Sequence, residues 1–137
     1  MMVADSTTKR KVYVSTLWCF PLHQCCQYFF EDPDEVDFTN LLNLRCGADS
    51  IVIRSKEKYR FCYFLNVLAK ERRFTKAVRD FWITEILKAT SIKENYYRSH
   101  YGDPLRDDFK DLKANKEIVR ELTEAINKAR SMIPNHT

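Results

Sequence analysis

Glycine occupies only two of the 137 positions in this chain, and proline only four. Glycine readily adopts the left-handed and tight backbone conformations on which dinucleotide-binding folds, phosphate-binding P-loops and glycine-rich turns depend. Its scarcity argues against all three architectures. Few glycines and prolines instead favour a helix-rich chain whose elements are joined by short connections.

The length of the chain indicates one domain with a core of its own. Residues 1–8 are polar, and we expect a disordered tail there, with residues 9–137 forming a single globular domain. No apolar run approaches the roughly 18 residues that span a bilayer, and no apolar signal-peptide core follows the polar N-terminus. We therefore expect a soluble intracellular protein, in the cytoplasm or nucleus, without membrane contact.

The N-terminal half carries two strand-like patterns. Residues 11–18 alternate β-branched and aromatic side chains with the period of a strand that Pro21 ends, and residues 50–54 form a second, shorter β-branched run. Between them, residues 22–30 fit a short helix. Asp34 is expected to cap a further helix that runs to about residue 46.

Residues 58–70 fit two patterns at once. Tyr59, Phe61 and Tyr63 alternate as in a strand, whereas Phe61 and Leu65 have the spacing of a helix. We favour the helix, because the stretch is long and contains no turn residue, but the strand interpretation remains open.

The later part of the chain has clearer helical signals. Residues 73–89 show a broad apolar face, residues 93–101 favour one more helical turn, and residues 116–133 form an amphipathic pattern that Asn115 is expected to cap. This order of elements predicts an α+β fold: a predominantly helical single domain with a small two- or three-stranded sheet from the N-terminal half.

Positive charge is concentrated in the middle of the chain. Residues 50–101 hold twelve Lys or Arg against five Asp or Glu, whereas residues 1–49 are net acidic and residues 102–137 are neutral. The same stretch contains ten aromatic residues. Cations that attract phosphates and rings that stack on unpaired bases are the means by which proteins bind nucleic acid. Solvated charges over an aromatic core would produce the same composition.

The residues of this segment predicted to bind nucleic acid fall into two types. The positive field is assigned to Arg54, Lys58, Arg60, Arg72, Arg73, Lys76 and Arg79. Stacking or anchoring is assigned to Tyr96, Tyr97 and Tyr101. Lys70 and Arg98 belong to the same basic–aromatic region. We predict a non-enzymatic binding or regulatory module, of viral or eukaryotic type, whose partner is RNA, DNA or an acidic protein surface.

A protein-interaction or adaptor domain is the alternative function. The amphipathic segment 116–133 would then dock on a partner or form a homodimer. Its apolar positions predicted for that interface are Leu122, Ile126, Ala129 and Ile133. A core helix of the monomer is the more favoured interpretation of the same pattern.

Enzymatic activity is the least favoured class. Cys19, His23, Cys25 and Cys26 lie close together in the sequence, but their spacing matches no common zinc pairing and no known cysteine-nucleophile motif. Their apolar neighbours favour buried core thiols. The two groups of carboxylates, around residues 32–37 and 103–111, are expected to cap helices rather than to hold a metal. We therefore predict no catalytic residue, no metal and no cofactor.

Overall fold

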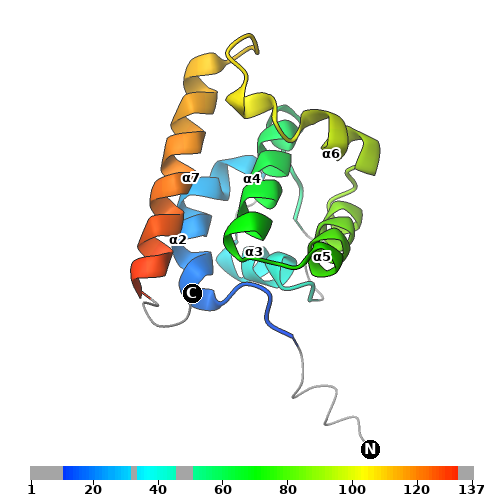
Figure 1. Ribbon diagram of the computed structural model, residues 1–137, viewed down its shortest axis with the longest axis vertical. Helices are drawn as coiled ribbons and strands as arrows, with labels where there is room; N and C mark the ends of the chain where they lie inside the picture. The colour runs from blue at the N-terminus through cyan, green and yellow to red at the C-terminus, as the bar shows by residue number, and fades with distance from the viewer. Residues whose placement is uncertain (1–10, 32–33, 46–50, 133–137) are drawn as a thin grey trace, which may run out of the picture.

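A computed structural model of the chain describes residues 11–31, 34–45 and 51–132. These residues form six α-helices and three short 3-10 helices (Figure 1). The α-helices are α2 (Thr16–Cys26), α3 (Glu35–Leu42), α4 (Lys58–Glu71), α5 (Lys76–Ala89), α6 (Glu94–His100) and α7 (Leu112–Met132). The 3-10 helices are η1 (Gln27–Phe29), η3 (Ser55–Glu57) and η4 (Asp103–Leu105).

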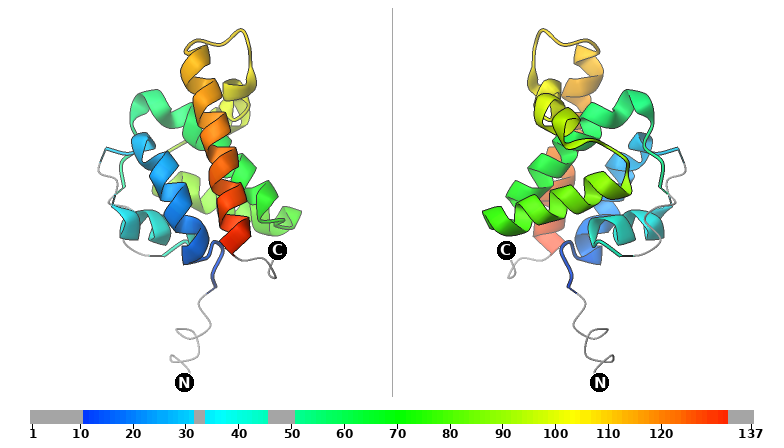
Figure 2. Two further views of the ribbon diagram at one scale, coloured as in Figure 1. Left: turned by 90° about the vertical axis from the view of Figure 1, so that its left-hand side faces the viewer. Right: turned by 90° about the vertical axis from the view of Figure 1, so that its right-hand side faces the viewer.

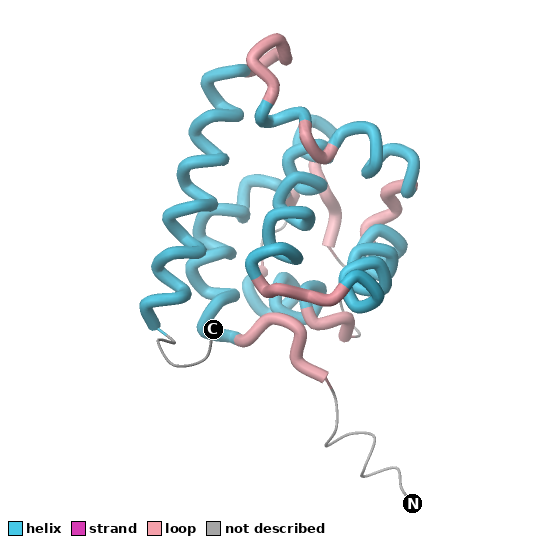
Figure 3. Tube along the Cα trace, in the orientation of Figure 1, coloured by secondary structure: helices cyan, strands magenta, loops and turns pink. Residues whose placement is uncertain are grey.

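The predicted sheet is wrong for the described residues, which contain helices and loops but no strand (Figure 3). Residues 11–15 form a loop that bends at Tyr13 and Val14, and a side chain rather than a partner strand binds its backbone. The backbone nitrogens of Tyr13 and Val14 donate to Asn43 Oδ1 at 2.7 and 2.9 Å, and Asn43 Nδ2 donates to the Val14 carbonyl at 2.9 Å. Helix α2 then begins directly after Ser15, and Pro21 lies inside it rather than ending a strand.

The second predicted strand is reduced to one bridge. Ile51 and Ile53 are buried and Val52 is half exposed, as strand alternation requires. However, among the described residues only Phe30 pairs with this segment, through an isolated antiparallel bridge to Ile53. A single bridge satisfies two backbone hydrogen bonds and nucleates no sheet, so the part of the chain that the structure describes is all-helical rather than α+β.

Residues 58–70 form a helix, as favoured from the sequence, and the reason for the ambiguous pattern is now visible. Helix α4 lies in the centre, with α2 and α7 on one side and α5 and α6 on the other (Figure 1). Eight of its fourteen residues are buried. A helix surrounded on most sides has apolar residues nearly all round, which removes the clean 3.6-residue period.

Other boundaries follow local capping chemistry. Asp34 caps α3 as predicted, accepting from the nitrogens of Val36 and Asp37 at 2.7 and 3.3 Å. Thr75 caps α5, which therefore starts three residues later than the apolar pattern indicated. Helix α6 is confirmed. Helix α7 starts at Leu112, so Asn115 lies within the helix and is not its cap.

The core joins both halves of the molecule. Helix α7 runs along α2, as the side view in Figure 2 shows, and it also contacts α4; buried side chains of all three helices belong to one connected cluster. Aromatic rings fill much of that cluster, with Phe29, Phe30, Phe38 and Phe61 in edge contacts near 6 Å. Trp82 anchors α5 by donating from Nε1 to the Leu42 carbonyl at 2.7 Å. None of the described helices has the length and apolar content needed to cross a membrane.

Candidate functional site

Three of the predicted nucleic-acid-binding arginines are occupied by contacts within the chain. Arg54 donates from Nε to the Phe30 carbonyl at 2.9 Å. Arg60 donates to both carboxylate oxygens of Glu57, and its side chain is only 11% exposed. Arg60 is nearly buried against a carboxylate, so its charge is not available to a ligand, whereas Arg54 is an exposed residue whose Nε is held by a neutral carbonyl.

Arg72 is the third internal arginine. Its Nε donates to the Tyr13 carbonyl at 3.1 Å, and its guanidinium lies 5.2 Å from the centre of the Trp18 ring. Burial lowers the pKa of Arg72. The contact ties the end of α4 to the segment that precedes α2, which makes Arg72 a structural residue.

A buried amide organises the end of the molecule where α7 begins. Asn115 is fully buried, and its Oδ1 accepts from the Tyr59 hydroxyl at 2.9 Å and from Arg60 Nε at 2.6 Å. Its Nδ2 donates to the Lys110 carbonyl at 3.1 Å. We call Tyr59, Arg60 and Asn115 the Asn115 cluster. It joins α4 to α7, and through Asn115 it provides a second internal contact of the Arg60 guanidinium besides Glu57.

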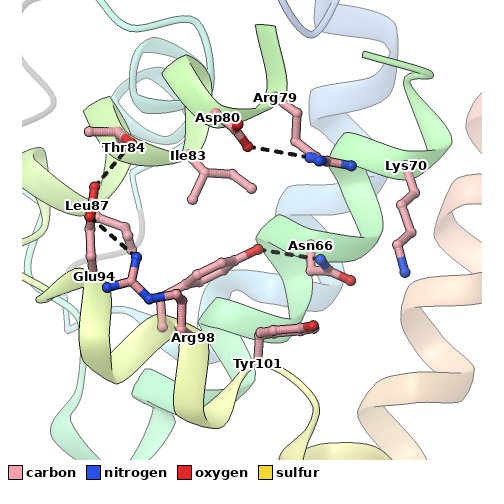
Figure 4. Close-up of a pocket in the computed structure, with 11 residues that line it drawn as sticks. Asn66, Lys70, Arg79, Asp80, Ile83, Thr84, Leu87, Glu94, Arg98 and Tyr101 are labelled. Atoms are coloured by element: carbon pink, nitrogen blue, oxygen red, sulfur yellow. Dashed lines mark hydrogen bonds and ion pairs between the residues drawn. The ribbon is translucent and has the colours of Figure 1, made fainter. Parts of the chain in front are cut away.

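Part of the remaining predicted set lies together elsewhere, on a pocket of about 520 Å³ bounded by α4, α5 and α6 (Figure 4). We call it the α4–α6 groove. Three predicted residues line it: Arg79, Tyr97 and Tyr101. Lys70 and Arg98, from the same basic–aromatic region, line it as well. Of the other predicted residues, Lys58, Arg73 and Tyr96 lie outside its lining, and Lys76 adjoins it through an ion pair.

Tyrosines and aliphatic side chains form the less polar part of the groove. The Tyr97 and Tyr101 rings stack with their centres 5.3 Å apart and 22° between their planes. Tyr97 is held further by its hydroxyl, which accepts from Asn66 Nδ2 at 3.4 Å, and burial raises its pKa. Tyr101 remains 38% exposed. Ile83 and Leu87 of α5 complete this apolar lining.

The charged rim is divided into pairs. Arg79 lies 3.6 Å from Asp80, which also forms a 2.7 Å ion pair with Lys76, and that bond holds the pKa of Asp80 below its usual value. Glu94 pairs with Arg98 at 3.5 Å and accepts from Thr84 at 3.2 Å.

Lys70 differs from these paired groups: it is exposed and makes no ion pair with any residue that the structure describes. With Lys76 included, four cations face two carboxylates, so the groove carries two excess positive charges.

Several lining residues were missed from the sequence, among them Asn66, Asp80, Thr84 and Glu94. The sequence did contain a signal, because these residues occur in pairs four positions apart. The pairs are Asn66 and Lys70, Asp80 and Thr84, and Glu94 and Arg98. Residues at this spacing share one face of a helix. The sequence does not say that these three faces meet.

The apolar positions predicted for a protein interface are inside the monomer. Leu122, Ile126 and Ala129 are at most 3% exposed and belong to the core, and Ile133 lies outside the described residues. They are not accessible to a partner in this structure, which agrees with the core-helix interpretation of the segment. The half-exposed apolar residues Leu17 and Phe20 lie on α2 instead.

Cys19, Cys26 and Cys62 occupy core positions, as expected, whereas Cys25 is partly buried and Cys46 lies outside the described residues. Cys19 and Cys26 are buried, which raises the pKa of Cys19 to about 11 and that of Cys26 well above its ordinary value. Such burial disfavours the thiolate that a nucleophile or metal ligand must become. The His23 ring lies against Phe38, with centres 5.3 Å apart. Within the described segments, no three His, Cys, Asp or Glu side chains are placed to share a metal ion.

Comparison with known proteins adds no assignment to this geometry. No protein-family model, no curated protein and no solved structure matches the chain.

Proposed function

We propose that this chain is a non-enzymatic binding module that binds nucleic acid through the α4–α6 groove. The observation that carries the proposal is the position of Lys70, Arg79 and the exposed Tyr101 on the lining of one pocket. Lys70 lies on α4, Arg79 on α5 and Tyr101 directly after α6, and these residue types are the combination that binds phosphate and base together.

Charge supports the same function. Coulomb attraction of phosphates supplies most of the sequence-independent affinity of such proteins, and releasing their counterions makes binding fall with salt. Lys70 has no carboxylate partner among the described residues, so a phosphate gains its full attraction without breaking an existing ion pair. Arg60 and Arg72 lack this freedom, and we exclude them from the binding surface.

Fluorescence anisotropy tests the proposal. Labelled RNA and DNA oligomers, single- and double-stranded, are titrated with the protein at low and moderate salt. We expect salt-dependent binding that Lys70→Glu weakens by roughly tenfold, with the salt slope reduced by about one or more. The matched control is Lys128→Glu on α7, which makes the same change in net charge at an exposed position remote in sequence from the groove.

Equal loss of affinity in both variants would reduce the effect to net charge and contradict a groove. Absence of binding at low salt would contradict nucleic acid as the partner. Light scattering and pull-down with a candidate protein would then address the interaction-module alternative.

A further inference from the structure

We infer that the α4–α6 groove holds one unstacked nucleotide, with its base on the Tyr101 ring and its phosphate beside Lys70 and Arg79. The inference rests on the proposed function and specifies its ligand: single strands bind in preference to duplexes, because a base paired within a duplex cannot enter a pocket. The size of the groove, about 520 Å³, lies within the roughly 300–1,000 Å³ typical of sites for small ligands.

The base site follows from the tyrosine pair. Tyr97 supports one face of the Tyr101 ring, and Asn66 fixes Tyr97 in turn, so Tyr101 is supported rather than free to rotate. Because Tyr101 stays 38% exposed, part of its ring is open to a planar ligand. An aromatic base stacks on such a platform with little dependence on sequence, since every base has a π-face.

The phosphate site follows from the charges. In Figure 4, Lys70 and Arg79 lie toward one end of the groove, whereas Glu94 and Arg98 lie toward the other. Lys70 is the cation without a carboxylate partner among the described residues, and Arg79 shares its charge with Asp80. Glu94 and Arg98 pair with each other at the far end, so that end offers a second phosphate no net attraction. This arrangement favours a single phosphate position.

The experiment compares three oligomers of equal length: a single strand containing the fluorescent base 2-aminopurine, an abasic strand with the same phosphates, and a duplex. We expect the base-containing strand to bind roughly 5- to 150-fold more tightly than the abasic strand, and 2-aminopurine fluorescence to be quenched by stacking. The duplex is expected to bind no better than the abasic strand.

Variants assign this difference to one ring. Tyr101→Ala is expected to abolish both the preference over the abasic strand and the quenching, whereas Tyr101→Phe retains both because the stacking face remains. Tyr28→Ala is the matched control, since Tyr28 is 68% exposed on η1 and does not line the groove. The circular dichroism of each variant verifies that its helices are intact.

The outcomes separate this inference from the function on which it rests. Equal affinity for the base-containing and abasic strands, with salt dependence and Lys70 dependence intact, overturns the base site and leaves nucleic-acid binding in place. Lack of binding to all three oligomers overturns both. Lys70-dependent binding of poly-glutamate in their place also overturns both and identifies an acidic protein as the partner.

Discussion

Arg60 and Arg79 come from the same basic segment, yet the fold uses them differently. Arg60 is nearly buried, and its guanidinium contacts Glu57 and Asn115. Arg79 lines an open groove and shares a carboxylate that Lys76 also contacts. In the Asn115 cluster a positive charge stabilises the contact between α4 and α7, whereas in the α4–α6 groove positive charges face solvent.

The difference shows that charge count does not measure the binding surface. Arg54, Arg60 and Arg72 each donate to a group within the chain. Part of the positive charge of the segment therefore belongs to side chains that stabilise the fold. A cation is more available to a ligand where the fold leaves it exposed, as Lys70 is, than where it is buried against internal acceptors, as Arg60 is.

Asn115→Ala should have the largest effect. The substitution removes the acceptor shared by the Tyr59 hydroxyl and Arg60 Nε, leaving a buried hydroxyl and a nearly buried N–H group without that partner. We expect the free energy of unfolding to fall by about 2–4 kcal/mol, measured by urea denaturation. The control is Asn127→Ala at an exposed position of the same helix. A loss equal to that of the control would show that the cluster does not stabilise the fold.

Exchanging arginine for methionine at the two contrasted positions should separate stability from binding. Arg60→Met is expected to lower the unfolding free energy by about 1–3 kcal/mol and to leave oligomer affinity unchanged in the folded protein. Arg79→Met should change stability by less than about 0.5 kcal/mol and weaken oligomer binding several-fold. Urea denaturation and anisotropy on both variants provide the four values. The reverse assignment of effects would invalidate the comparison.

The pH dependence of stability at alkaline pH should report on the buried core around α4. Burial raises the pKa of Cys62 to about 12, from 9.0 in an unstructured chain. The unfolded state therefore loses this proton first, and the stability that Cys62 contributes below pH 9 is lost as the pH rises toward 12. For this thiol the expected loss is about 1 kcal/mol between pH 9 and 10.

The Cys62→Ala variant isolates that contribution. Its unfolding free energy, measured from pH 8 to 10, should fall less steeply with pH than that of the unsubstituted protein. Parallel curves would show that the thiol ionises equally in both states, and hence that the α4 core admits water.

Helix-forming patterns were predictable where one face of the element is exposed. Residues 73–89 and 93–101 have such exposed faces, and the structure places α5 and α6 within these two ranges. The capping role of Asp34 was also predictable, because its carboxylate acts on nitrogens two and three residues ahead. Local chemistry of this kind requires no knowledge of the rest of the chain.

The errors occurred where a distant residue replaced a local partner. The strand expected at residues 11–18 fails because Asn43, about thirty positions away, satisfies the backbone of Tyr13 and Val14. Asn115 was expected to cap a helix, but its amide instead binds residues of α4, more than fifty positions earlier. Short polar side chains serve either role, and only the neighbours present in space select between them.

By itself, the sequence determined that this chain is rich in helix and that its positive charge and many aromatic rings lie in one segment. Glycine content, helical periodicity and the distribution of charge along the chain are local or additive properties, so they can be read from the sequence alone. The tertiary structure decided which arginines close the fold and which residues line the groove. Both depend on how α4, α5 and α6 are placed relative to one another. The spacing of residues along one helix gives no information on its distance from another helix.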